Sequence, residues 1–175
     1  MPEIGVNAKP RAKAGKHIMT LVGVKSIIRE NPFAKKEDGS KDEDALREQF
    51  IWDFESDQTN EFGDPLTYAV WTNTNYGNEK ASLTEFLGQI IPGLAKMSKQ
   101  DAIDSVRHMD TDTLLFTRYN FVLRDKQGKN GSFVAHTDIE PRTNDDGSVE
   151  IDVIRQTAAQ AAAQAAEDKA NETPV

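Results

Sequence analysis

Cysteine is absent from this chain of 175 residues, and aromatic residues make up only 7% of it. Without cysteine there is no disulfide, no thiolate metal site and no thiol nucleophile. No apolar run reaches the roughly 18 residues that span a bilayer, and no apolar segment follows the N-terminal basic residues as a signal peptide requires. These absences predict a cytoplasmic protein that does not enter a membrane.

Sequence patterns that carry catalysis are also missing. The histidines His17, His108 and His136 form no metal-binding pattern, and the chain has no phosphate-binding glycine loop and no GxSxG nucleophile motif. His136, Asp138 and Glu140 alternate, as they do on the solvent-facing side of an edge strand, which explains them better than a cation site. We therefore expect no enzyme activity, no metal and no cofactor.

The charge of the chain is unevenly distributed around a formal net charge of −8. Residues 1–36 carry eight bases against two acids, whereas residues 37–112 carry seventeen acids against six bases. Residues 113–137 are again basic and residues 138–175 are acidic. Because a polyanion responds to the local surface that it meets, the net charge does not exclude a nucleic-acid partner. The charges predict a basic stripe from the N-terminal arm, the first strand and a late hairpin.

Alternating side chains predict five strands, at residues 17–28, 48–55, 66–73, 113–124 and 132–139. The clearest signal is in the second, where Phe50, Trp52 and Phe54 alternate with other residues and predict one buried face. Gly23 inside the first strand predicts a bulge or a sharp bend. Between the first and second strands, residues 31–45 are polar and charged, so we expect a long mobile loop there.

Two helices are expected between the third and fourth strands, at residues 79–91 and 98–107, with Ser98 as the N-cap of the second. Residues 149–154 fit either a sixth short strand or the start of a tail. The predicted organisation is a flexible basic arm at 1–15, a domain at 16–142, and an acidic Ala/Gln-rich tail at 143–175. The tail is either disordered or a marginal helix, because large apolar residues are missing from it.

The order of these elements predicts a mainly β fold, a β-barrel with inserted helices. Five strands with a helix between strands 3 and 4 match an OB-fold-like Greek-key barrel. Other small barrels and α+β sheets share that order.

Candidate binding residues follow from what single-stranded nucleic acid requires, a basic groove for phosphates and flat side chains for bases. The candidate cations are Lys25, Arg29, Lys35, Lys36, Arg118, Arg124, Lys126 and Lys129. The candidate stacking residues are Phe33, Trp71, Tyr76 and Tyr119. Trp71 and Tyr119 are equally well explained as core aromatics, and the lysines as ordinary solubilising charge.

The chain resembles a family, the small OB-fold proteins encoded by bacteriophages and phage-like elements. The resemblance covers roughly residues 16–142 and rests on short segments such as FIWDFES, VWTNTNYGNEKASLTEFLGQIIPG and GSFVAHTDIEPR. The matching residues are Trp52, Phe54, Trp71, Thr72, Asn73, Leu83, Phe86 and Leu87. The resemblance implies a single-stranded-DNA-binding-like, replication-associated protein with no catalytic residue. The C-terminal NETPV departs from the acidic tip by which bacterial single-stranded-DNA-binding proteins recruit partners.

Two functions follow as expectations. The first is non-catalytic binding of single-stranded DNA in phage replication or recombination, in the host cytoplasm, with the acidic tail competing against DNA for the basic face. The second is a protein-interaction or structural module of a phage or phage-like element, whose Ala/Gln-rich tail docks on a protein partner.

Overall fold

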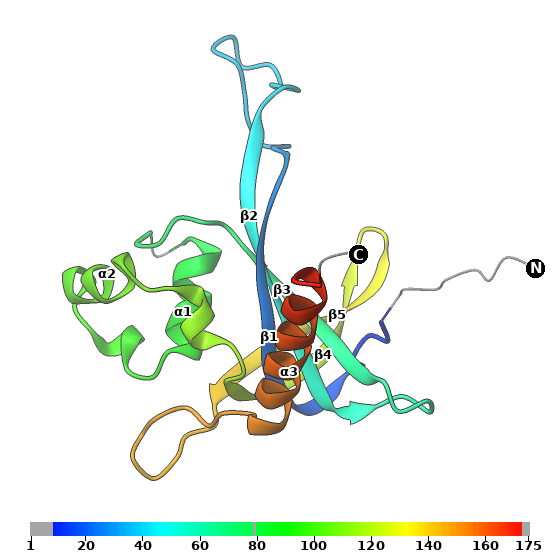
Figure 1. Ribbon diagram of the computed structural model, residues 1–175. Helices are drawn as coiled ribbons and strands as arrows, with labels where there is room; N and C mark the ends of the chain where they lie inside the picture. The colour runs from blue at the N-terminus through cyan, green and yellow to red at the C-terminus, as the bar shows by residue number, and fades with distance from the viewer. Residues whose placement is uncertain (1–8, 79, 173–175) are drawn as a thin grey trace, which may run out of the picture.

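The computed structural model describes residues 9–78 and 80–172 of the chain (Figure 1). Its described part contains a five-stranded antiparallel sheet in the order β3-β2-β1-β4-β5. The strands are β1 (Gly15–Glu30), β2 (Leu46–Thr59), β3 (Pro65–Thr72), β4 (Arg118–Gly128) and β5 (Gly131–Pro141). Strands β1 to β3 follow one another in space, and β4 returns to lie beside β1, which is the Greek-key order. The predicted mainly β class and five strands are confirmed.

The sheet does not close into a barrel by strand pairing, because β3 and β5 remain its two edges. The edge of β3 is occupied by the N-terminal arm, where Arg11 forms a parallel bridge with Thr67. One side chain crosses from β3 to β5. The hydroxyl of Tyr68 accepts the backbone N–H of His136 at 2.9 Å and lies 2.7 Å from Nδ1 of the same residue. This side-chain contact links β3 and β5, which are not neighbours in the hydrogen-bonded sheet.

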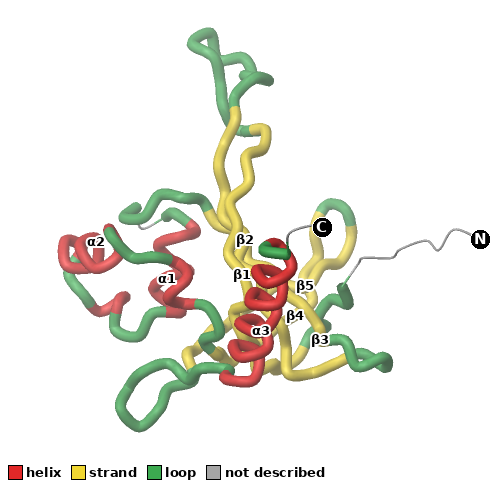
Figure 2. Tube along the Cα trace, in the orientation of Figure 1, coloured by secondary structure: helices red, strands yellow, loops and turns green. Residues whose placement is uncertain are grey.

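Figure 2 shows helix α1 (Ser82–Ile90) beside the sheet, and the core is formed by side chains of α1 and of the strands. The alternation in β2 places Trp52 and Phe54 in this core, and both are buried. The Trp52 ring lies 5.0 Å from the ring of Phe86 in α1, and the Phe54 ring lies 4.8 Å from that of Phe121 in β4. The Nε1–H of Trp52 donates to Oγ1 of Thr72 at 3.0 Å, which satisfies the indole inside the core.

The connection from β3 to β4 is helical, as expected, but longer than predicted. After α1 come a 3₁₀ turn η1 (Leu94–Lys96), helix α2 (Lys99–Arg107) and a second 3₁₀ turn η2 (Thr111–Leu114). Ser98 caps α2 as predicted, accepting the N–H of Asp101 at 3.2 Å. The prediction of strand from residue 113 was wrong. Asp110 accepts the N–H of Asp112 at 2.9 Å and starts η2, and a positive φ of 66° at Phe116 turns the chain before β4 begins.

Strands β1 and β2 continue past the sheet as a two-stranded ribbon, which projects at the top of Figure 1. Residues 24–30 pair with residues 46–52, whereas β4 pairs with β1 only at residues 15–20. The register shift between Leu21 and Gly23 is the predicted bulge. At the tip, residues 31–45 form hydrogen-bonded turns, including Asp42 N–H to the Ala34 carbonyl at 2.9 Å.

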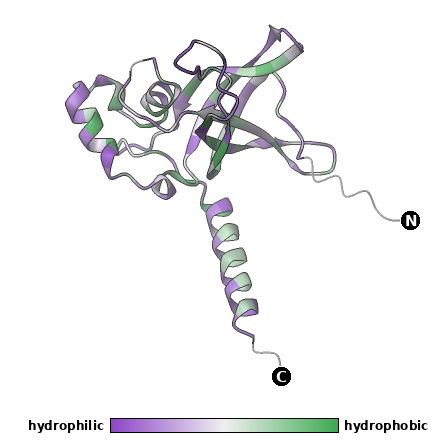
Figure 3. Cartoon of the chain, turned by 90° about the horizontal axis from the view of Figure 1, so that it is seen from above, coloured by the Kyte–Doolittle hydropathy of each residue, from purple (hydrophilic) through white to green (hydrophobic). Residues whose placement is uncertain are grey.

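The segment before the C-terminal helix pairs with the sheet. The N–H of Arg118 donates to the Glu150 carbonyl at 2.9 Å, and the N–H of Asp152 donates to the Phe116 carbonyl at 2.7 Å. Ile151 forms an isolated bridge with Thr117 and Val149 forms one with Thr143, but residues 149–152 form no further strand. Helix α3 (Val153–Ala170) then projects away from the sheet (Figure 3), and none of its residues is buried. The helical alternative for the tail is therefore the one observed.

Asp152 fixes the base of α3 and is only 5% exposed. Its Oδ2 accepts hydrogen bonds from Thr20 Oγ1 at 2.8 Å, from Arg155 Nη1 at 2.7 Å and from Arg118 Nη1 at 3.2 Å. Its Oδ1 caps the helix by accepting the N–H of Arg155 at 3.0 Å. Burial opposes ionisation, but the hydrogen bonds from Arg155 and Thr20 and the charge of Arg155 outweigh it. They lower the pKa of Asp152 to about 2.

Candidate nucleic-acid interface

A groove of about 840 Å³ lies on the outward face of the sheet, opposite the core. Strands β1, β2 and β3 provide its floor, the β4–β5 hairpin one wall and the N-terminal arm another. The side chains that line it include Lys9, Arg11, Lys25, Ile51, Asp53, Trp71 and Phe133. Here "the groove" means this surface.

Two half-exposed aromatic rings line the groove. Trp71 of β3 is 46% exposed and Phe133 of β5 is 49% exposed. Trp71 is paired across the sheet with Ile51, which is paired in turn with Lys25. The guanidinium of Arg29 lies 5.5 Å from the centre of the Trp71 ring, within cation–π range. The two rings offer flat apolar surface beside cations, which is what base stacking requires.

The ribbon extends the basic side of the groove. Because direct partners in an antiparallel pair share a face, Lys25, Arg29 and Arg47 lie on one face of the ribbon. Glu30 and Glu48 lie on the opposite face. Alternation along β1 and β2 therefore separates the cations of the ribbon stem from its acids.

An exposed aromatic continues the basic face toward the tip of the ribbon. Phe33 is 78% exposed, and the guanidinium of Arg47 lies 5.7 Å from the centre of its ring. Arg29 on Trp71 and Arg47 on Phe33 thus form two cation–aromatic pairs in succession along the ribbon face. A single-stranded nucleic acid that followed this face would meet one cation and one aromatic ring at each pair.

The acids that face the groove are neutralised by ion pairs. Lys25 Nζ lies 3.6 Å from Asp53 Oδ2, and Arg155 Nε lies 3.4 Å from Glu55 Oε1. Across residues 9–78 and 80–172, Lys9, Arg11 and Arg29 form no ion pair. The groove therefore carries net positive charge on a chain that is acidic as a whole.

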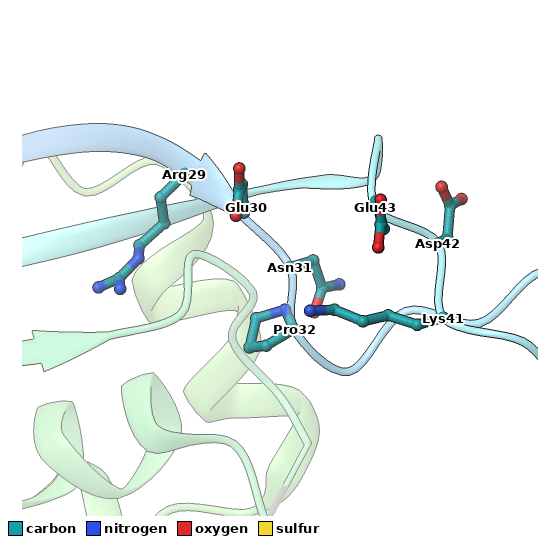
Figure 4. Close-up of a pocket in the computed structure, with 7 residues that line it drawn as sticks. All are labelled: Arg29, Glu30, Asn31, Pro32, Lys41, Asp42 and Glu43. Carbon is teal, nitrogen blue, oxygen red and sulfur yellow. The ribbon is translucent and has the colours of Figure 1, made fainter.

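A second hollow, of about 550 Å³, lies at the ribbon tip and is a poorer candidate (Figure 4). Glu30, Asp42 and Glu43 line it beside Lys41, and Figure 4 shows the Arg29 side chain pointing away from them. An anion entering this hollow would meet more acids than bases.

Seven of the eight predicted cations lie on the ribbon, its tip or the late hairpin, and most of these are outside the groove. Lys25 lines the groove. Arg29 does not line it, but its guanidinium lies over the ring of Trp71, which does. Lys35 and Lys36 are exposed at the ribbon tip, among the acids there. The exposed residues of the β4–β5 hairpin include the predicted cations Arg124, Lys126 and Lys129, and Lys126 pairs directly with Phe133.

Three predicted residues are buried or are engaged in contacts within the fold. Tyr119 is fully buried, and burial, partly offset by its hydrogen bond with Thr117, raises its pKa to about 12. Tyr76 is half-buried and packs against the core. Arg118 is held by Asp57 at 2.6 Å and by Glu150 and Asp152. The buried alternative holds for Tyr119, and the exposed one for Trp71.

Four residues of the basic and aromatic surface were not among the candidate binding residues predicted from the sequence. Phe133 and Arg47 follow the strand alternation of their neighbours, which the sequence contains. Lys9 and Arg11 belong to a segment expected to be flexible, and only its pairing with β3 places them at the groove.

Comparison of the chain with protein-family models, with curated proteins and with solved structures finds no match. Among the described helices, none combines the length and apolar character that crossing a lipid bilayer needs. Where the structure describes the chain, three or more His, Asp or Glu side chains nowhere come together as a metal ion would require.

Proposed function

We propose that this chain binds single-stranded DNA along the groove and the ribbon face, without catalysis. One observation carries the proposal. Two half-exposed rings, Trp71 and Phe133, lie in a groove whose acids are ion-paired and whose remaining side-chain charges are positive. Rings give bases a sequence-independent stacking surface, and cations follow the phosphates. Weak sequence preference and steep salt dependence are expected.

The architecture supports an OB-fold-like interpretation. The spatial order β3-β2-β1-β4-β5, with α1 between β3 and β4, agrees with a five-stranded, partly open Greek-key barrel. In such barrels oligonucleotides lie on the face of strands 2 and 3, between the 1–2 and 4–5 loops. The groove occupies that face, with the β1–β2 ribbon at one end and the β4–β5 hairpin beside it. The sequence resemblance to phage proteins adds replication or recombination as the setting.

The test uses the two tryptophans, Trp52 in the core and Trp71 in the groove. Oligo-dT should quench the emission of the wild-type protein at low salt, and the quenching should weaken steeply as salt rises. Trp71→Phe should abolish most of the quenching and keep most of the affinity, measured by anisotropy of a labelled oligomer. Trp71→Ala should lower the affinity by about 1–3 kcal/mol, or about 5- to 150-fold.

The matched control is Phe62→Ala, because Phe62 is a fully solvated aromatic in the β2–β3 turn and does not line the groove. It should bind as the wild type does. Absence of binding at low salt would refute the proposal and favour the protein-interaction module. Binding that Trp71→Ala does not weaken would move the interface away from the groove.

A further inference from the structure

Residues 9–13 of the N-terminal arm lie extended along the edge of β3, bridged to it at Arg11, with their charged side chains alternating with Pro10 and Ala12. Residues 9–13 read Lys-Pro-Arg-Ala-Lys. Lys9, Arg11 and Lys13 are exposed, Pro10 is half-buried, and Ala12 is buried at 5% exposure within the hydrophobic core. This period of two is that of a half-buried strand. We call residues 9–13 the arm strand.

Backbone hydrogen bonds fix the arm strand on the edge of β3. The N–H of Ala12 donates to the Thr67 carbonyl at 2.8 Å, and the N–H of Thr67 donates to the Pro10 carbonyl at 2.7 Å. The Thr67 hydroxyl adds a second bond to the Pro10 carbonyl at 3.0 Å. The position of the arm strand is therefore set by β3, beside the groove.

A buried histidine anchors the other end of the arm strand. Nε2–H of His17 donates to the Lys13 carbonyl at 2.7 Å, and Nδ1 of the same ring lies 2.9 Å from Ser56 Oγ. His17 is buried. With Ala12 in the core and Lys13 held by His17, the arm strand is held at two successive residues.

From this arrangement we propose that the arm strand binds phosphates, with Lys9, Arg11 and Lys13 taking successive phosphates of a single strand in the groove. Alternate residues of a strand lie about 6.6 Å apart, twice the rise of about 3.3 Å per residue, and the phosphates of an extended single strand are similarly spaced. Lys9 and Arg11 line the groove directly. The inference rests on the proposed function and adds an ordered phosphate-binding element to it.

The arm strand suits phosphates better than it suits a protein strand added to its outer edge. Exposed charges along an edge discourage the addition of a further strand, and Lys9, Arg11 and Lys13 are all exposed. Arg11, at the centre of the arm strand, presents a fork of N–H donors that matches phosphate oxygens. Three cations without an acid among them favour a polyanion as the occupant.

The test compares two triple variants of the whole chain that remove the same charge. Lys9→Ala/Arg11→Ala/Lys13→Ala removes the proposed phosphate contacts. The control removes three exposed lysines from the helical connection, Lys80→Ala/Lys96→Ala/Lys99→Ala. The probe is labelled oligo-dT of about 15 nucleotides, within the site sizes of OB-folds, titrated by anisotropy over a range of salt. Circular dichroism checks that both variants fold.

Each phosphate contact contributes about 0.7 to the slope of log K against log salt for single strands. The arm variant should therefore lose about 2 from the slope. From 1 M to 0.1 M salt the affinity of the wild type should therefore rise about 100-fold more than the affinity of the arm variant. The control should keep the wild-type slope. Equal slopes for the arm variant and the wild type would overturn the inference and leave the proposed function standing, whereas no binding by the wild type would refute both.

A second variant separates an ordered arm strand from a flexible basic arm. Ala12→Gln keeps all three cations but places a larger polar side chain in the core position of Ala12, so the arm strand should detach. If order matters, this variant should weaken binding by about tenfold or more, since the three contacts together are worth about 100-fold. Wild-type affinity for Ala12→Gln would refute the ordered arm strand.

Discussion

Replacing Asp152 by asparagine should destabilise the protein at neutral pH and not at low pH. Asparagine has the same size and is as good an N-cap as aspartate, so the change removes the charge and keeps the cap of α3. The folded pKa of about 2 lies below the ordinary aspartate value of 3.8. Folding therefore favours the ionised form, and each pKa unit is worth about 1.4 kcal/mol. The side chain is almost fully buried, so the ionised carboxylate contributes about 2 kcal/mol at pH 7.

The sign of the pH dependence follows from the direction of this shift. A group with a depressed folded pKa stabilises the fold above its unfolded pKa, and that stability is lost as pH falls toward the folded pKa. The wild-type protein should lose about 2 kcal/mol between about pH 5 and pH 2 on account of Asp152. The Asp152→Asn variant lacks this contribution throughout.

Urea unfolding followed by tryptophan emission measures the effect. At pH 7 the midpoint of Asp152→Asn should fall with an unchanged m-value, by the equivalent of about 2 kcal/mol. Near pH 2.5 the wild type and the variant should approach each other. An equal loss at both pH values would show that the charge is not the source of the stability. No loss at pH 7 would show that the network around α3 contributes nothing to folding.

Three further outcomes are expected. Tyr68→Phe removes the hydroxyl that meets His136 and should cost about 1–2 kcal/mol in urea unfolding, and an unchanged midpoint would contradict the bridge between β3 and β5. Tyr119→Phe should leave oligo-dT affinity unchanged because the ring is buried, and a loss in a folded variant would place it in the interface after all. Truncation after Gln156 removes most of α3 and should keep the fold, whereas truncation before Glu150 also removes the Asp152 network and should destabilise the protein. Thermal melts compare the two variants. Equal melting temperatures would contradict the anchoring role of Asp152.

The predicted tail, residues 143–175, contains the buried Asp152, so competition between the tail and DNA has to be tested with a shorter deletion. Deleting all of residues 143–175 would remove the buried Asp152, so any change in binding would be mixed with loss of stability. The truncation after Gln156 removes the acids at the far end of α3 and leaves the network in place. Higher oligo-dT affinity of this variant is the result expected if the tail competes with DNA, and unchanged affinity would refute competition.

Local pattern was enough to predict most of the secondary structure. The alternation around Trp52 and Phe54 predicted the buried face of β2, and Ser98 predicted the start of α2. In both cases the cause is confined to neighbouring residues. The start of β4 was predicted wrongly, because the residues before it have the composition of a strand. In the structure the Asp110 cap and the left-handed conformation of Phe116 form a turn there instead.

The site was harder to predict because its residues are sorted by long-range contacts. Trp71 and Tyr119 have the same strand signal, and they differ because Tyr119 lies on the core face of the sheet and Trp71 lies on the face that carries the groove. Arg118 has the charge of a phosphate ligand, but it is committed to Asp57, which is distant in the sequence. The arm strand needs β3 to become a strand at all. Nothing within five neighbouring residues specifies any of these outcomes.

The unclosed edge between β3 and β5 has a topological consequence. The Tyr68–His136 pair lies between the two strands, and the groove is a surface channel that the described residues do not encircle. A polymer bound there enters sideways and needs no free end to thread. A covalently closed circle is then as accessible as a linear chain. The number of protein copies that a long strand accepts should scale with its contour length and be independent of the number of its ends.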